Sequence, residues 1–129
     1  MSTTDQKWLY TSDMEASLKF KFTGSNKIIQ NFSQAFQDLF VLSMLDGKQN
    51  GLFLEVGAHN PIDYNNTYLL EKKFGWSGVS IDIDPVHIDD WQVARPTSNL
   101  VIADALKLDY NEILSSLCES NTAMTPCHN

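Results

Sequence analysis

The spacing of hydrophobic positions changes along the chain and marks out alternating helices and strands. Residues 31–45 carry apolar side chains at helical spacing, with Ser33 as a candidate N-cap and Gly47 just past the end. Residues 52–56 form an apolar run interrupted by one acid, which is typical of a parallel strand buried on both faces. Later segments repeat this alternation, with helices expected at 67–74, 87–94 and 110–117 and strands at 79–84 and 99–105.

The order of strand, helix and strand predicts an α/β domain with a parallel, Rossmann-like sheet. At 129 residues the chain has room for one domain with a modest core. We expect an N-terminal arm at 1–30, a partial nucleotide-binding domain at 31–117 and a disordered tail at 118–129. Within the arm, Phe20 and Phe22 alternate with lysines, a pattern that predicts a short edge strand.

The charge balance narrows the classes of partner. The chain has 16 Asp and Glu residues against 9 Lys and Arg residues, a formal net charge of −7. Because the basic residues form no cluster, the sequence argues against a nucleic-acid partner and against an anionic membrane surface. No stretch approaches the ~18 apolar residues of a membrane span, and the N-terminus lacks the pattern of a secretory signal. We therefore expect a cytoplasmic protein.

Both cysteines fall near the C-terminal end of the chain. Cys118, Cys127 and His128 have a spacing that fits no common zinc motif, so we expect no metal site there. Free thiols in a reduced cytosol are the expected state of the two cysteines.

The turn after the first strand carries the strongest chemical signal. Glu55 ends a run that should be buried, so it either faces a ligand at the carboxyl end of the strand or caps backbone N–H groups of the turn. Gly57 and Ala58 follow at once, and small residues there let a bound group approach the backbone. The later glycine positions of a dinucleotide turn are occupied by His59 and Ile62, which counts against a nicotinamide dinucleotide.

Two acids lie at the carboxyl end of the following strand. Asp82 and Asp84 lie two residues apart and therefore on the same side of that strand, where an acid commonly accepts hydrogen bonds from ribose hydroxyls. A turn acid before Pro85 is the simpler alternative. A calcium loop that adds Asp89 and Asp90 is a third interpretation, but it lacks the glycine and the terminal glutamate of that motif.

Five segments, taken in order, resemble the FkbM family of S-adenosylmethionine-dependent methyltransferases. They are SQ at 33–34 with QD at 37–38, FLEVGA at 53–58, NTYLLE at 66–71, GWSG at 75–78 and ID at 81–82. The resemblance implies a class I methyltransferase fold and methyl transfer from S-adenosylmethionine, commonly to a hydroxyl oxygen of a small molecule or a glycan. It identifies no catalytic base in this sequence.

The resemblance also implies a set of cofactor contacts. Glu55, Gly57 and Ala58 match the motif around the methionine part of the cofactor. Asn66 and Thr67 match positions that help to hold its amino-acid end.

The remaining contacts implied by the family lie at the ends of the next two strands. Asp82 matches the acid that binds the ribose, with Asp84 as a near alternative. Asp104 and Ala105 match the position beside the adenine, where the side chain accepts from the exocyclic amine.

The family's fold has seven strands, whereas this sequence supplies candidates for three. The first strand would therefore lie at a sheet edge with unpaired N–H and C=O groups. We expect a truncated methyltransferase, or alternatively a non-catalytic half-domain that binds a nucleoside or pairs with another chain through that edge, for instance as a homo-oligomer.

Overall fold

The structure, a computed structural model, describes residues 21–120. Predictions that fall on residues 1–20 and 121–129, including Phe20 and most of the expected tail, lie outside the described part. Phe22 is described and lies before a turn rather than in a strand. Within residues 21–120, no helix combines the length and the apolar character needed to cross a bilayer.

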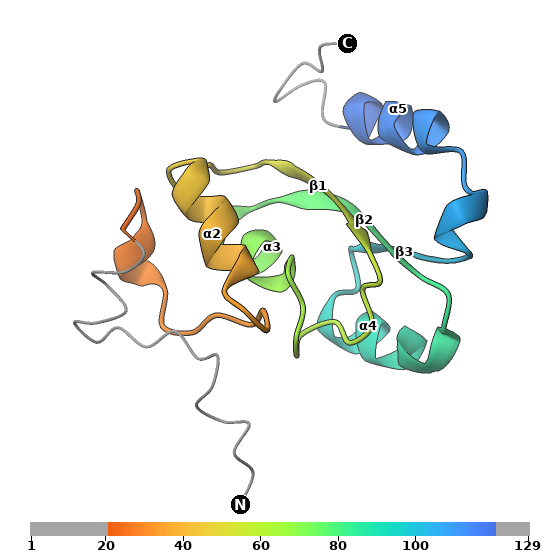
Figure 1. Ribbon diagram of the computed structural model, residues 1–129, viewed down its shortest axis with the longest axis horizontal. Coiled ribbons are helices and arrows are strands. Elements are labelled where there is room, and N and C mark those ends of the chain that lie inside the picture. The colour runs from red at the N-terminus through yellow and green to blue at the C-terminus, as the bar shows by residue number, and fades with distance from the viewer. Residues whose placement is uncertain (1–20, 121–129) are drawn as a thin grey trace, which may run out of the picture.

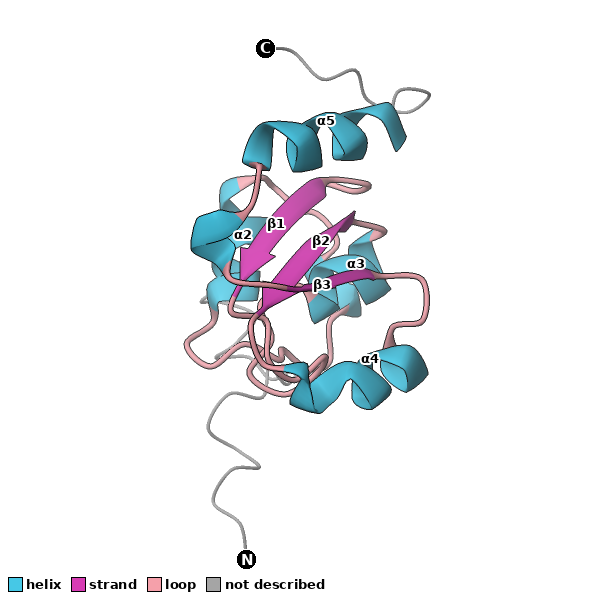
Figure 2. Cartoon of the chain, turned by 90° about the vertical axis from the view of Figure 1, so that its right-hand side faces the viewer, coloured by secondary structure: helices cyan, strands magenta, loops and turns pink. Residues whose placement is uncertain are grey.

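Within residues 21–120, three parallel strands form one small open sheet in the order β1-β2-β3. Figure 2 shows them side by side. The strands are β1 (Leu52–Val56), β2 (Ser77–Asp82) and β3 (Asn99–Ile102). The helices are α2 (Gln37–Met44), α3 (Tyr68–Phe74), α4 (Ile88–Ala94) and α5 (Tyr110–Ser120), and the short 3-10 turns are η2 (Ser25–Lys27), η3 (Pro85–His87) and η4 (Ala105–Lys107). The α/β prediction is confirmed.

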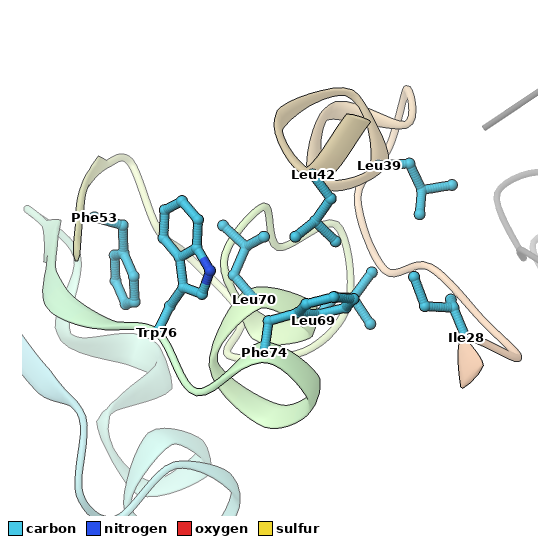
Figure 3. Packing of buried hydrophobic residues seen from close by; sticks show 8 residues of the cluster. All are labelled: Ile28, Leu39, Leu42, Phe53, Leu69, Leu70, Phe74 and Trp76. Carbon is cyan, nitrogen blue, oxygen red and sulfur yellow. The ribbon is translucent and has the colours of Figure 1, made fainter. Parts of the chain in front are cut away.

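One face of the sheet is covered by α2 and α3. Their apolar side chains pack on Phe53 of β1 in a cluster drawn in Figure 3, whose members are Ile28, Leu39, Leu42, Phe53, Leu69, Leu70, Phe74 and Trp76. Gly78 lies opposite Phe53 in the ladder, and a Cβ atom there would fall 2.0 Å from the Phe53 carbonyl oxygen. Glycine is therefore required at this position by the close approach of the two strands.

The other face is covered only in part. Helix α5, which Figure 1 shows apart from α2 and α3, packs Leu117 on Val79 and Ile81 of β2. On β1 the side chains of that same face, Leu54 and Val56, remain 38% and 59% exposed. The sequence predicted that residues 52–56 are buried on both faces of the sheet, but β1 is buried only on the face that packs against α2 and α3.

The first long helix begins later than its periodicity predicts. Helix α2 starts at Gln37 because Phe36 has a left-handed backbone with φ 63°, which stops the helix from extending further back. The fully buried Asp38 carboxylate accepts hydrogen bonds from the backbone N–H groups of Phe32 and Ser33, at 3.0 and 3.3 Å, and from the Ser33 hydroxyl. Ser33 is therefore part of a buried turn and not an N-cap, so that expectation was wrong.

The strands expected at 79–84 and 99–105 both end early, because in each case an aspartate side chain begins a 3-10 turn. The Asp84 and Asp104 side chains accept from the N–H groups two residues ahead, at 3.0 and 2.9 Å, and so begin η3 and η4. The strands stop at Asp82 and Ile102.

The end of the described chain also departs from expectation. Helix α5 continues to Ser120, past its expected end at residue 117. Cys118 is disulfide-bonded, so the expectation of a free thiol was wrong for this residue.

Strand β1 lies at the edge of the sheet, as expected. The hydrogen bonds from Ser77 N–H to the Gly51 carbonyl and from Gly57 N–H to the Ile81 carbonyl show that odd-numbered positions of this strand face β2. Because strand backbones alternate direction, the N–H and C=O groups of Leu52, Leu54 and Val56 point to the open edge.

Candidate functional site

A small pocket opens at the carboxyl ends of the three strands. Its volume is about 220 Å³, and it is lined by Gly57, Ile81, Asp82, Ile83, Ala103, Asp104 and Ala105. Four of the nine residues expected to contact a cofactor thus lie around one space. Carboxyl ends of parallel strands are where open α/β sheets bind their ligands.

The turn after β1 presents backbone to this pocket. Gly57 has φ 76°, a conformation that favours glycine, and a Cβ atom there would meet nothing within 4 Å. The N–H groups of Gly57 and Ala58 both donate to the Ile81 carbonyl, at 2.8 and 3.0 Å, so the turn is tied to the end of β2. The Ala58 side chain is buried beneath the turn and outside the pocket lining.

Asp82 is the acid that the surrounding backbone orients most closely. Its Oδ2 accepts from the His59 N–H at 2.7 Å, and its Oδ1 accepts from the Asp84 N–H at 2.8 Å. A carboxylate oxygen has more than one acceptor site, so both oxygens retain capacity for a ligand hydroxyl.

The other two acids at this edge have structural contacts. Asp84 uses Oδ1 to cap η3 and does not line the pocket. Asp104 uses Oδ1 to cap η4 and does line it, beside Ala105, whose carbonyl accepts from the Tyr110 hydroxyl at 2.5 Å. Asp104 therefore has a second carboxylate oxygen available at the pocket.

Glu55 lies on the opposite face of the sheet, beneath α3. Its Oε1 accepts from Ser80 Oγ at 3.0 Å, Thr67 Oγ1 at 3.2 Å and Asn65 Nδ2 at 3.4 Å, and the residue is 8% exposed. Burial raises the pKa of the Glu55 carboxyl above its ordinary value, against the lowering effect of the hydrogen bonds from Ser80, Thr67 and the Asn66 backbone and of the Arg95 charge. Three of its hydrogen bonds come from side chains and one comes from the backbone of Asn66, so the alternative that Glu55 caps backbone N–H groups holds only in part. A contact of Glu55 with the cofactor stays a prediction.

Asn65, rather than Asn66, organises the entry to α3. Its Oδ1 accepts from the Thr67 N–H at 2.9 Å, while its Nδ2 donates to the carbonyls of Ala58 and Asn60 at 3.3 and 3.0 Å. Asn66 is exposed, and Thr67 is buried with its hydroxyl turned inward. Neither lines the pocket, so their role at the amino-acid end of a cofactor stays a prediction.

Arg95 is a residue that sequence reasoning missed. Its side chain is fully buried, and the guanidinium donates two hydrogen bonds to the Glu71 carboxylate, at 3.1 and 3.0 Å. The remaining bonds, at 3.0–3.3 Å, reach Asn65 Oδ1, Thr67 Oγ1 and the Pro61 carbonyl. An arginine directly before a proline in a polar stretch is typical of an exposed loop, so no local signal marks this one.

Comparison with protein-family models, with curated proteins and with solved structures finds no match to this chain. Within residues 21–120 there is no group of three or more His, Cys, Asp or Glu side chains that could together hold a metal ion. The candidate site therefore rests on its own geometry.

We predict that Glu55 makes stability depend on pH. Because its folded-state pKa is raised above 4.5, the folded chain binds this proton more tightly than the unfolded chain does. Its contribution to the free energy of unfolding is then present at low pH and is lost as pH rises from about 4.5 through the folded-state pKa. Glu55→Gln, which keeps the size and one acceptor oxygen, should flatten this decline by up to ~1.4 kcal/mol per pH unit.

Urea denaturation at intervals from about pH 4 to about pH 8 measures this slope. Glu112→Gln, at an exposed position of α5, is the matched control and should leave the slope as it is. A Glu55→Gln chain with the original pH profile would contradict the prediction.

We predict that Arg95→Met destabilises the fold by about 3–5 kcal/mol, because the Glu71 carboxylate, whose side chain is only 14% exposed, loses its charged partner. Arg95→Lys should recover only part of this, since an ammonium group cannot serve the carboxylate and three further acceptors at once. Denaturant unfolding measures both variants beside Lys107→Met, which removes an exposed cation. Equal losses from Arg95→Met and Lys107→Met would show that the network is not critical for stability.

Proposed function

We propose that the pocket at the carboxyl edge of the sheet binds the nucleoside part of S-adenosylmethionine, and that the chain serves in methyl transfer of the FkbM type. The observation that carries this proposal is the convergence of Gly57, Asp82, Asp104 and Ala105 on one space. All four are among the nine positions that the family resemblance relates to the cofactor. By the same proposal, β1, β2 and β3 form the first half of a class I methyltransferase fold.

The chemistry of the lining suits a nucleoside. Asp82 offers a carboxylate, fixed by two backbone N–H groups, that can accept from ribose hydroxyls. Asp104 offers a second carboxylate whose free oxygen can accept from the adenine amino group. Gly57 leaves open space over its Cα atom, so a ligand can approach the backbone.

The pocket volume sets a limit on what it holds. At about 220 Å³ it is smaller than the ~300–1,000 Å³ of sites that enclose a drug-sized ligand, so it accommodates only part of the cofactor. The cofactor, when bound, would supply a methyl group on a positively charged sulfur. The proposed acceptor is a hydroxyl oxygen on a small molecule or a glycan, and the group that takes its proton is not identified.

We predict that the purified chain binds S-adenosylhomocysteine in calorimetric titration. Asp82→Asn should weaken binding by about 10- to 100-fold, because it replaces a charged acceptor of two ribose hydroxyls with a neutral one. Asp104→Asn should weaken it as well while preserving the cap of η4 through its remaining oxygen.

Asp89→Asn is the control, since it removes an exposed acid from α4 away from the pocket lining. Circular dichroism on each variant establishes that it is folded. A folded chain that fails to bind, or that binds equally well with both pocket acids replaced, would overturn the proposal.

A second candidate function is a half-domain that pairs with another copy of itself through β1. The open edge carries the backbone groups of Leu52, Leu54 and Val56, and the side chains of Leu54 and Val56 are partly exposed beside it. An apolar edge strand of this kind is a template for pairing with a second chain. Across a twofold axis, two such edges would join antiparallel into one six-stranded sheet.

This candidate predicts a dimer mass in multi-angle light scattering that shifts toward the monomer on dilution. Val56→Lys should favour the monomer, because a lysine on an edge strand opposes pairing. Leu106→Lys is the control, since Leu106 is 95% exposed in η4, away from that edge. A monomer at every concentration would eliminate this candidate and leave the nucleoside proposal intact.

A further inference from the structure

Two histidines from separate parts of the chain form a hydrogen bond beside the candidate pocket. His59 lies in the turn after β1, and His87 closes η3 after β2. Their Nε2 atoms are 3.3 Å apart, within hydrogen-bond distance. On its other side, His87 Nδ1 lies 2.9 Å from Oδ2 of Asp90, which belongs to α4. The contacts therefore connect a carboxylate through one imidazole to a second imidazole.

These contacts fix where each ring carries its proton. An ionised carboxylate only accepts, so a neutral His87 carries its proton on Nδ1, facing Asp90. The Nε2 atom of His87 is then an acceptor, and the proton of a neutral His59 lies on Nε2, facing His87. Within residues 21–120, no group donates a hydrogen bond to His59 Nδ1. That nitrogen therefore keeps a free lone pair.

The backbone of His59 is held in a conformation that is uncommon for a side-chain-bearing residue. Its φ is 55°, in the left-handed region, and in the sequence it occupies the second glycine position of a dinucleotide turn. The His59 N–H donates to Asp82 Oδ2 at 2.7 Å, and the His59 carbonyl accepts from Trp91 Nε1 at 2.8 Å. Backbone conformations of this kind cluster at functional sites, which indicates a role for the imidazole.

The same hydrogen bonds place His59 beside the pocket. Asp82 lines the pocket and is the proposed acceptor of ribose hydroxyls, and it binds the His59 N–H directly. The His59 residue itself is exposed and is not part of the pocket lining. A molecule that approaches the pocket from solvent can therefore reach the His59 ring.

We propose that His59 Nδ1 is the general base that takes the hydroxyl proton of the methyl acceptor, with His87 and Asp90 as positioning residues. This inference rests on the proposed methyl transfer. As the acceptor oxygen bonds to the methyl carbon, the bond from that carbon to sulfur breaks, and its electron pair stays on sulfur. The hydroxyl proton passes to His59 Nδ1 and from the exposed ring to solvent. While the ring is charged, it keeps its hydrogen bond to His87 Nε2.

This role sets a distance between the ring and the transferred methyl group. A general base lies ~2.6–3.2 Å from the oxygen whose proton it takes, and that oxygen lies ~3–3.5 Å from the carbon that it attacks. His59 Nδ1 must therefore come within about 6–7 Å of the methyl carbon. The Hε1 proton of the ring is next to Nδ1 and reports this proximity.

The test is an NMR titration of the full chain with S-adenosylmethionine that carries a ¹³C-labelled methyl group. We expect a nuclear Overhauser cross-peak between the bound methyl group and the His59 Hε1 proton. It should be lost in His59→Asn, since asparagine tolerates the positive φ there, and should remain in His128→Ala. Binding without this cross-peak would overturn the general-base role and leave the methyltransferase proposal standing, whereas absence of binding would overturn both.

A second measurement tests the two positioning residues without any cofactor. Long-range ¹H–¹⁵N spectra at about pH 8, where histidine is neutral, show which nitrogen of each ring carries the proton. We expect the proton of His59 on Nε2 and that of His87 on Nδ1. His87→Phe removes the acceptor and should leave His59 as a mixture of tautomers, whereas His87→Gln supplies a carbonyl oxygen and should keep the single tautomer.

Asp90→Ala should likewise release the His87 proton from Nδ1 and give a mixture of tautomers at His87. A His59 proton on Nδ1 in the unaltered chain, or tautomers that stay the same in His87→Phe and Asp90→Ala, would overturn the positioning roles.

Discussion

The buried guanidinium of Arg95 is the constraint around which the polar side of the fold is arranged. It occupies the space between α3 and the segment after α4, where its donors reach Glu71, Asn65 and Thr67. Thr67 in turn donates to Glu55 of β1, so one connected set of hydrogen bonds joins a strand, a helix start and a loop. Because a buried charge without partners is strongly destabilising, the guanidinium can be buried only when the strand, the helix start and the loop are all in place.

This network also positions the candidate site from beneath. Asn65 belongs to the network and donates to the carbonyls of Ala58 and Asn60, which fixes the turn after β1. The upper side of that turn is tied to Asp82 through the His59 N–H. The backbone at Gly57 is thus held from both sides of the sheet, and the pocket is shaped by groups that do not line it.

The acids at the strand ends make different contacts, although they occupy similar positions in the sequence pattern. Asp84 and Asp104 both begin 3-10 turns, yet only Asp104 reaches the pocket. Glu55 ends an equally apolar run but turns to the opposite face, where burial raises its pKa. The same residue type in the same kind of position therefore caps backbone, lines a pocket or joins an internal network, according to the face on which it falls.

The order of the elements, the parallel α/β character and the edge position of β1 were all determined by the sequence alone, because periodicity and chain order are local properties. The convergence of Gly57, Asp82 and Asp104 was predictable for the same reason, since carboxyl ends of parallel strands share one edge. The start of α2, the burial of Arg95 and the meeting of His59 with His87 were decided only by tertiary structure. The last two depend on partners far apart in sequence. The start of α2 depends on the left-handed backbone of Phe36 and on the hydrogen bonds of Asp38 with Phe32 and Ser33, and the spacing of apolar residues encodes neither.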